Sequence, residues 1–176
     1  MTKKIVSIDA ETNGLWGNAF SIAAVIADKQ GNIEKSFIGR CPIDGTVNNW
    51  VAENVLPQIE NIPITHESYQ ELLKDFCEFY LTHKEGAEII VHMGLPVEAK
   101  LFLDAHDLNF IGDWDAPFPL VDISAIPKIS TSVDNYCALH NISTDPEIYQ
   151  GGTHNPLFDA TQALRAWVHY NNNNNK

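Results

Sequence analysis

The chain opens on three consecutive strand patterns, and this opening constrains the fold more than any other feature. The apolar segments are Lys4–Ala10, Phe20–Ala27 and Ile33–Gly39, and the second and third flank the turn-rich Asp28–Asn32. Short stretches rich in Asp, Asn and Gly between strand patterns are typical of tight turns between antiparallel neighbours. The sequence therefore predicts an antiparallel three-stranded start.

Helical and strand patterns then alternate. Apolar residues at three-to-four spacing predict two helices, one around Trp50–Leu56 and one around Leu72–Tyr80. The later elements are a strand over Ala87–His92, a helix opened by Gly94-Leu95-Pro96, a short strand at Leu120–Asp122 and a helix from Pro156 to about Tyr170. A hairpin followed by such units is typical of mixed sheets in α/β or α+β domains.

Length and composition favour one domain. The chain has 176 residues, of which 44% are hydrophobic, enough for one substantial core. We expect a single domain over residues 1–170 and a frayed polar tail over 171–176, where asparagine dominates.

The three cysteines are Cys41, Cys77 and Cys137, with no CxxC pair, so neither a disulfide framework nor a zinc ribbon is indicated. No signal peptide or membrane-spanning run is apparent. We therefore expect a cytoplasmic protein without membrane contact.

The net charge of -12 argues against a long, tightly held duplex, because phosphate affinity normally comes from clustered lysine and arginine. Divalent cations bound by carboxylates can reverse the local sign where a phosphate arrives. The acidity thus favours short or single-stranded ends as partners.

Two acids stand where the first strand leaves the core. Side chains two apart in a strand point to the same side, so Asp9 and Glu11 present neighbouring carboxylates. Two adjacent anions are costly without a cation, although a solvated strand end would explain the pair equally simply. Further ligands are needed to decide.

Glu98 and Asp159 are further acids, each in the first turn of a predicted helix. Asn155 is a good N-cap and Pro156 suits the first helical position, which places His154 in the preceding loop. An acid at a helix start is common and needs no metal. The order of one strand end and two helix starts nevertheless allows these groups to converge at one sheet edge.

Three segments resemble the motifs of the DEDDh exonuclease family: Ile8–Leu15, His92–Phe102 and His154–Ala160. They occur in the family's order and span most of the chain. The segment Trp50–Pro57 further resembles small stand-alone bacterial exoribonucleases such as RNase AS and RNase T. Glu98 departs from the family pattern, which ordinarily has aspartate there.

The resemblance implies an RNase H-like α/β fold, with helices around a mixed sheet whose first three strands are antiparallel and the rest parallel. It implies that Asp9, Glu11, Glu98 and Asp159 hold two Mg²⁺ ions, with Mn²⁺ able to substitute, while His154 activates water. Hard oxygen ligands suit these ions. The implied reaction is 3′–5′ exonuclease hydrolysis of RNA or DNA, RNA preferred, releasing nucleoside 5′-monophosphates.

The resemblance also implies that Thr12, Leu15 and Met93 bind the terminal nucleotide and that the protein is a homodimer. For Leu15, ordinary core filling is an equal alternative. Asp122 also lies near the expected site, where it would either support a metal ligand through a hydrogen bond or cap a turn, and it is not counted as a ligand. Two other functions stay open: a phosphodiesterase for dinucleotides or small nucleotides, and a non-catalytic nucleic-acid-binding module of the same fold.

Overall fold

A five-stranded sheet forms the centre of the computed structural model, which describes residues 4–129, 132–143 and 151–174. Its strand order is β3-β2-β1-β4-β5, so the first strand of the chain lies in the middle. The strands are β1 (Ile5–Thr12), β2 (Ala19–Ala27), β3 (Ile33–Arg40), β4 (Glu88–Val91) and β5 (Leu120–Asp122).

The pairing confirms the predicted mixed sheet. β1 pairs antiparallel with β2, and β2 pairs antiparallel with β3. β1 pairs parallel with β4, and β4 pairs parallel with β5. The carboxyl ends of the three parallel strands therefore meet at one edge of the sheet.

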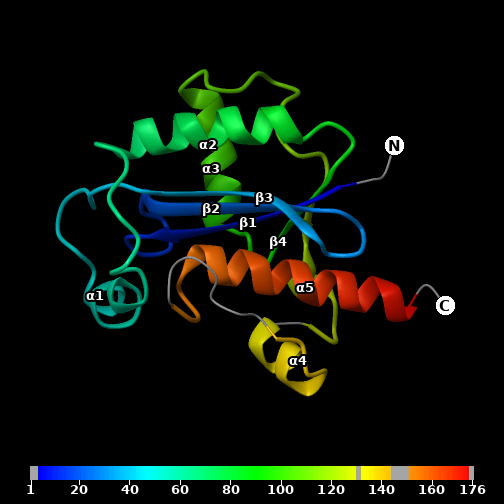
Figure 1. Cartoon of the computed structure of the whole chain (residues 1–176). Helices are drawn as coiled ribbons and strands as arrows, with labels where there is room; N and C mark the ends of the chain where they lie inside the picture. Colours follow the sequence, from blue (N-terminus) through cyan, green and yellow to red (C-terminus); the bar gives the residue numbers. More distant parts are fainter. Residues whose placement is uncertain (1–3, 130–131, 144–150, 175–176) are drawn as a thin grey trace.

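Helices cover both faces of the sheet. α2 and α3 lie on one face, while α5, with α4 packed beside it, lies on the other (Figure 1). The helices are α1 (Asn49–Asn54), α2 (Tyr69–His83), α3 (Val97–Asp107), α4 (Val133–Leu139) and α5 (Pro156–Asn174), with short 3₁₀ turns η1 (Leu56–Gln58) and η2 (Ile123–Ala125).

Burial of β2 on both faces follows from this layering. Every residue of β2 is buried. Ile22, Ala24 and Ile26 join the core under α2 and α3, whereas the alternating Ala23 and Val25 join the core under α5. A strand covered on both sides is expected to be mostly apolar, and β2 is apolar except for Ser21, whose hydroxyl donates a hydrogen bond to the Gly39 carbonyl at 3.1 Å.

Two boundaries differ from the sequence-based expectation. β1 continues to Thr12, so Glu11 lies within the strand. α5 continues to Asn174, beyond the expected end near Tyr170, because no glycine or proline follows Tyr170 to stop the helix. The rest of the expected polar tail lies outside the described residues.

The structure also contains α4, whereas the sequence predicted no helix between Asp122 and Pro156. Ser132 caps this helix by accepting a hydrogen bond from the N–H of Asn135 (3.1 Å), and Val133, Tyr136 and Cys137 are its buried residues. Within the described residues, no helix is both long and apolar enough to cross a membrane.

Candidate active site

Asp9 and Glu11 lie near the carboxyl end of β1, at the edge where the parallel strands end. Both line one cleft, as side chains two apart in a strand should. The Asp9 Oδ2 atom is buried and has no hydrogen-bond partner among the described residues. A buried carboxylate oxygen without a partner is costly unless it is protonated or meets a cation.

Glu98 reaches the same cleft from α3. Its side chain is only 3% exposed, and its Oε1 accepts a hydrogen bond from the backbone N–H of Ala10 at 2.9 Å. A helix-start acid that only complements the helix dipole would be expected at the solvated surface. Glu98 is instead turned inward, onto the strand residue next to Asp9.

Asp159 comes from the first turn of α5, on the opposite face of the sheet from α3. Its Oδ2 accepts a hydrogen bond from the backbone N–H of His154 at 2.7 Å. Asn155 caps the helix, because its Oδ1 accepts from the N–H groups of Leu157 (3.1 Å) and Phe158 (3.3 Å). The cap fixes the direction in which Asp159 enters the cleft.

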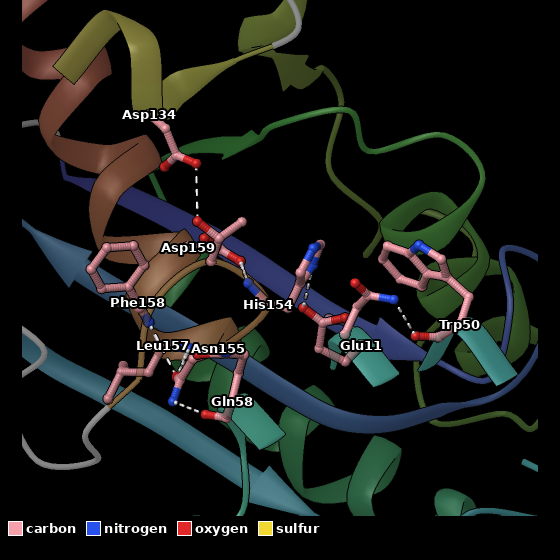
Figure 2. A network of polar contacts seen from close by, with 12 residues as sticks. Glu11, Trp50, Gln58, Asp134, His154, Asn155, Leu157, Phe158 and Asp159 are labelled. Carbon is pink, nitrogen blue, oxygen red and sulfur yellow. Dashed lines mark hydrogen bonds and ion pairs between the residues drawn. The ribbon is translucent and has the colours of Figure 1, made fainter. Parts of the chain in front are cut away.

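His154 lies in the turn before α5, where the sequence placed it. Its backbone has a φ of +75°, in the left-handed region. Its Nδ1 is 3.9 Å from Glu11 Oε1, and its ring meets the Trp50 indole edge to face, with centroids 5.1 Å apart (Figure 2). The imidazole therefore stands beside the carboxylates rather than in solvent.

Glu11, His154 and Asp159 each offer a ligand atom within 4.8 Å of the other two. Two oxygens and one imidazole nitrogen at this spacing could hold a metal ion. His154 thus has two chemical roles open to it in this geometry, ligand and base.

Burial disfavours the ionised form of all four carboxylates. Burial, and then the charge of Glu98, raises the pKa of Asp9 well above its ordinary value. Burial, followed by the charges of Asp9 and Asp159, does the same to the pKa of Glu11. Burial raises the pKa of Glu98 to about 8, although the hydrogen bond from Ala10 opposes this.

The pKa of Asp159 is likewise raised well above its ordinary value, first by burial and then by Asp9, while the His154 N–H lowers it. For His154, burial lowers the pKa below its ordinary value of 6.5, with Asp134 acting in the opposite direction. The ionised acids therefore need a nearby cation, and the imidazole is neutral near neutral pH.

The four carboxylates and His154 line one cleft of about 540 Å³. Thr12, Leu15 and Met93 line it as well. Leu15 is 66% exposed and Met93 is 53% exposed. Core filling, the alternative considered for Leu15, is therefore wrong. Both apolar side chains are free to contact a ligand in the cleft.

No lysine or arginine lines the cleft in the described part of the chain, whereas Asp134 adds a fifth acid. A phosphate entering this cleft would meet no basic side chain. Asp134 was not among the predicted site residues because α4, the helix that carries it, was not predicted. The capping Ser132 before apolar residues at helical spacing was the signal that could have revealed it.

Trp50 also lines the cleft and was predicted only as an apolar helix residue. Trp50 lies on a short helix whose one buried residue is Val51, and its own side chain is 54% exposed. A large apolar side chain that stays exposed beside a cleft is typical of a binding surface, but this exposure is visible only in the structure.

Asp122 caps a turn, which is one of the two roles expected for it. Its carboxylate accepts hydrogen bonds from the N–H groups of Met93 (3.0 Å), Gly94 (3.1 Å) and Ser124 (2.9 Å). Burial would raise the pKa of Asp122, but these hydrogen bonds lower it. Asp122 thereby holds the backbone that carries Met93 into the cleft.

No protein-family model matches the chain, and no curated protein matches it in sequence. Solved structures do share its fold. Exonuclease I from Methylocaldum szegediense superimposes with a TM-score of 0.67 at 11% identity, over 99% of this chain and 41% of that one. E. coli exonuclease I in complex with an oligonucleotide gives a TM-score of 0.64 at 11% identity, over 98% and 41%.

Exonuclease X in complex with 5′ overhanging duplex DNA gives a TM-score of 0.61 at 17% identity, over 98% of this chain and 93% of that one. The chain thus spans about two fifths of the length of exonuclease I and nearly all of exonuclease X. At this level of identity the similarity concerns architecture: the chain has the mixed α/β, RNase H-like fold of these exonucleases.

Proposed function

We propose that this protein is a metal-dependent 3′–5′ exonuclease of the DEDDh type that releases nucleoside 5′-monophosphates from nucleic-acid ends. The observation that carries the proposal is the convergence of Asp9, Glu11, Glu98 and Asp159 with His154 in one cleft. These groups come from a strand and two helices on opposite faces of the sheet. The exonuclease fold of the chain supports the same conclusion.

The donor set fits divalent cations. The buried Asp9 Oδ2 has no partner among the described residues, and burial raises the pKa of all four acids. Oxygen ligands of this kind select Mg²⁺ or Mn²⁺ over softer metals. When bound, two such ions would help to generate the attacking hydroxide and stabilise the leaving 3′ oxygen.

His154 supplies the base in this reaction. Its imidazole is neutral near neutral pH because burial lowers its pKa, so it can accept a proton from the attacking water. The water oxygen bonds to phosphorus, the bond from phosphorus to the 3′ oxygen breaks, and the 3′ oxygen takes a proton from solvent. The products are a nucleoside 5′-monophosphate and a shortened chain with a 3′ hydroxyl.

Glu98 replaces the aspartate usual at its position, and the longer side chain has a structural consequence. From α3 its carboxylate reaches the Ala10 N–H on β1. The extra methylene therefore spans the gap between helix and strand and keeps the carboxylate in the cleft with Asp9 and Glu11. This supports a ligand role for glutamate at this position.

On the substrate side, Leu15 and Met93 would pack against the terminal base and Thr12 would contact the last nucleotide. The lack of lysine and arginine among the described lining residues favours short or single-stranded ends. RNA preference and a homodimer belong to the proposal through the resemblance to RNase AS and RNase T.

Degradation of labelled RNA and DNA oligonucleotides, with free or blocked 3′ ends, tests the proposal in Mg²⁺, Mn²⁺ or EDTA. We expect stepwise loss from free 3′ ends only, dependent on the metal, and none by Asp9→Asn, which keeps the shape of the side chain. Turnover in EDTA, or full activity in Asp9→Asn, would refute the metal-dependent mechanism. A protein that binds the oligonucleotides without turnover under every condition would be a binding module.

The cleft without basic side chains also suits the second candidate function, a phosphodiesterase for dinucleotides or other small nucleotides. A length series separates the two functions. An exonuclease cleaves oligonucleotides of every length from the 3′ end, whereas a dinucleotide phosphodiesterase loses activity once the substrate exceeds two nucleotides.

A further inference from the structure

His154 lies in a turn, and its own backbone does little to fix its ring. It has a φ of +75°, a conformation that non-glycine residues adopt at some energetic cost. Its N–H is held by Asp159, but this bond leaves the side-chain torsions free. A base must be held within about 0.5 Å of its working position, so neighbouring elements have to supply the constraint.

One constraint acts on the ring. The Trp50 indole meets the His154 imidazole at an interplanar angle of 85° and a centroid distance of 5.1 Å. Trp50 is itself fixed at the start of α1, where its N–H donates to the capping Asn48 Oδ1 at 2.9 Å. Asn48 in turn donates its N–H to Asn13 Oδ1 (2.8 Å), which ties α1 to the turn after β1.

The other constraint acts on the backbone next to His154. Asn155 is 1% exposed, and its Nδ2 donates a hydrogen bond to the Gln58 carbonyl of η1 at 3.2 Å. A side chain at Gly151 would come within 2.5 Å of Asn155 Nδ2 and 2.8 Å of the Gln58 oxygen, so glycine leaves room for this bond. Figure 2 shows Trp50 on one side of His154 and the hydrogen bond between Asn155 and Gln58 on the other.

We propose that the segment Asn49–Gln58 positions His154, with Trp50 holding its ring and the Gln58 carbonyl holding its backbone through Asn155. Trp50 and Asn155 are thus positioning residues for the general base. The inference rests on the proposed function, in which His154 is that base. The elements α1 and η1 thereby join β1, α3 and α5, which carry the carboxylates, in building the site.

Two pairs of variants separate this role from simpler ones. Asn155→Ser keeps an oxygen that caps α5 but loses the donor to Gln58, whereas Asn155→Ala loses both. Trp50→Leu removes the ring contact, and Trp114→Leu, at an 87% exposed tryptophan that does not line the cleft, is its control. Misplacement of a base lowers kcat, so we expect Asn155→Ser and Trp50→Leu each to lower kcat about 10- to 100-fold with little change in KM.

A purely structural Asn155 would lose activity only in Asn155→Ala, in step with lost stability, and that result would overturn the proposal. Trp50 lines the cleft, so a direct contact with substrate must also be tested. In a His154→Ala background neither Trp50→Leu nor Asn155→Ser should lower the residual turnover further. A further loss of the same size would assign Trp50 to substrate binding and refute the positioning role.

The positioning can be measured without turnover. In NMR spectra of the full chain we expect nuclear Overhauser effects between the Trp50 indole and the His154 imidazole, weakened in Asn155→Ser and retained in Trp114→Leu. Unchanged effects in Asn155→Ser would refute the proposed link. Because this measurement needs no nucleic acid, a protein without nuclease activity would contradict the proposed function while the link itself is still tested.

Discussion

The Glu98 carboxylate on α3 accepts a hydrogen bond from the backbone N–H of Ala10 on β1, at 2.9 Å and out of contact with solvent. The bond joins a helix on one face of the sheet to the strand that carries Asp9. It also accounts for glutamate here, since aspartate has one methylene less with which to reach the strand. Glu98 therefore has a structural contact and a proposed ligand role that substitutions can separate.

Glu98→Gln keeps an oxygen that can accept from Ala10 but removes the charge. We expect folding to be retained and activity to fall about 100-fold or more, because a cation ligand contributes several kcal/mol to the transition state. Steady-state rates in Mg²⁺ and chemical unfolding measure the two effects. Full activity in Glu98→Gln would remove Glu98 from the metal site.

Glu98→Asp keeps the charge but shortens the reach. The buried Ala10 N–H then loses its acceptor, and we expect a loss of about 1–3 kcal/mol in unfolding free energy. Activity should fall partially, with Mn²⁺ restoring more than Mg²⁺, because Mg²⁺ requires stricter octahedral geometry. Equal activity in both metals would contradict this account.

Protonation of Glu98 predicts an unusual pH dependence of stability for the metal-free protein. Its pKa is about 8 in the folded protein and near 4.5 when unfolded, so between these values the folded state binds more protons. Stability from this group is therefore present at the acidic end of the window and lost as the pH rises towards 8.

His154 and His169, whose pKa values are lowered by burial, act in the opposite direction below pH 6.5. Thermal unfolding in EDTA should therefore be compared between the wild-type protein and Glu98→Gln, which differ at one titrating group. We expect the Tm of Glu98→Gln to rise relative to wild type from pH 4.5 to 8. A constant difference would show that Glu98 titrates normally.

His154→Ala distinguishes base from ligand. As a base, His154 should contribute about 10²–10⁴-fold to turnover, and its loss should leave the affinity for Mg²⁺ nearly unchanged. The ascending limb of the pH profile of kcat/KM should lie below pH 6.5, because burial lowers the pKa of His154, and should vanish in the variant.

Calorimetric titration of Mg²⁺ into His154→Ala and Asp9→Asn provides the comparison. Asp9→Asn should lose metal binding, and His154→Ala should not. If both variants lose it, Glu11, His154 and Asp159 form a ligand set and His154 is not the base.

The sequence predicted most of the fold because its strongest signals are local. The mostly apolar run of β2 and the turn at Asp28–Asn32 specify the antiparallel start without tertiary information. The site acids were also identifiable, since Asp9 and Glu11 share one side of a strand and Asn155-Pro156 fixes the start of α5. What the sequence could not supply was distance: the bond from Glu98 to Ala10 joins residues 88 positions apart.

The missed features have the same origin. Trp50 belongs to a six-residue helix with one buried residue, so the apolar pattern there carries little periodic signal. Its contact with His154 joins two residues that lie far apart in the sequence, which no local pattern reveals. α4 was missed because it has only seven residues, too few for a clear helical period of apolar positions. Leu15 could not be assigned to core or surface because the turn around Gly14 decides its exposure.

The acidic lining of the cleft predicts that KM depends only weakly on salt concentration. Five acids line it, with no lysine or arginine among the described lining residues, so few counterions should be released when substrate binds. For one phosphate contact to a single strand, KM should change by less than about threefold between 50 and 200 mM salt, whereas 6–10 contacts on a duplex change affinity by about 10³–10⁵.

Asp134 offers the matched variants, because it lines the cleft and is exposed, and its charge reaches the site, where it acts to raise the pKa values of Asp159 and His154. Asp134→Lys should lower KM and steepen its dependence on salt, since it adds a cation to the lining of the cleft. Asp134→Asn, which can still accept the hydrogen bond from Thr153 Oγ1, should change both quantities less. A steep salt dependence in the wild-type protein would mean that basic residues outside the cleft hold the substrate, and the preference for short ends would then be wrong.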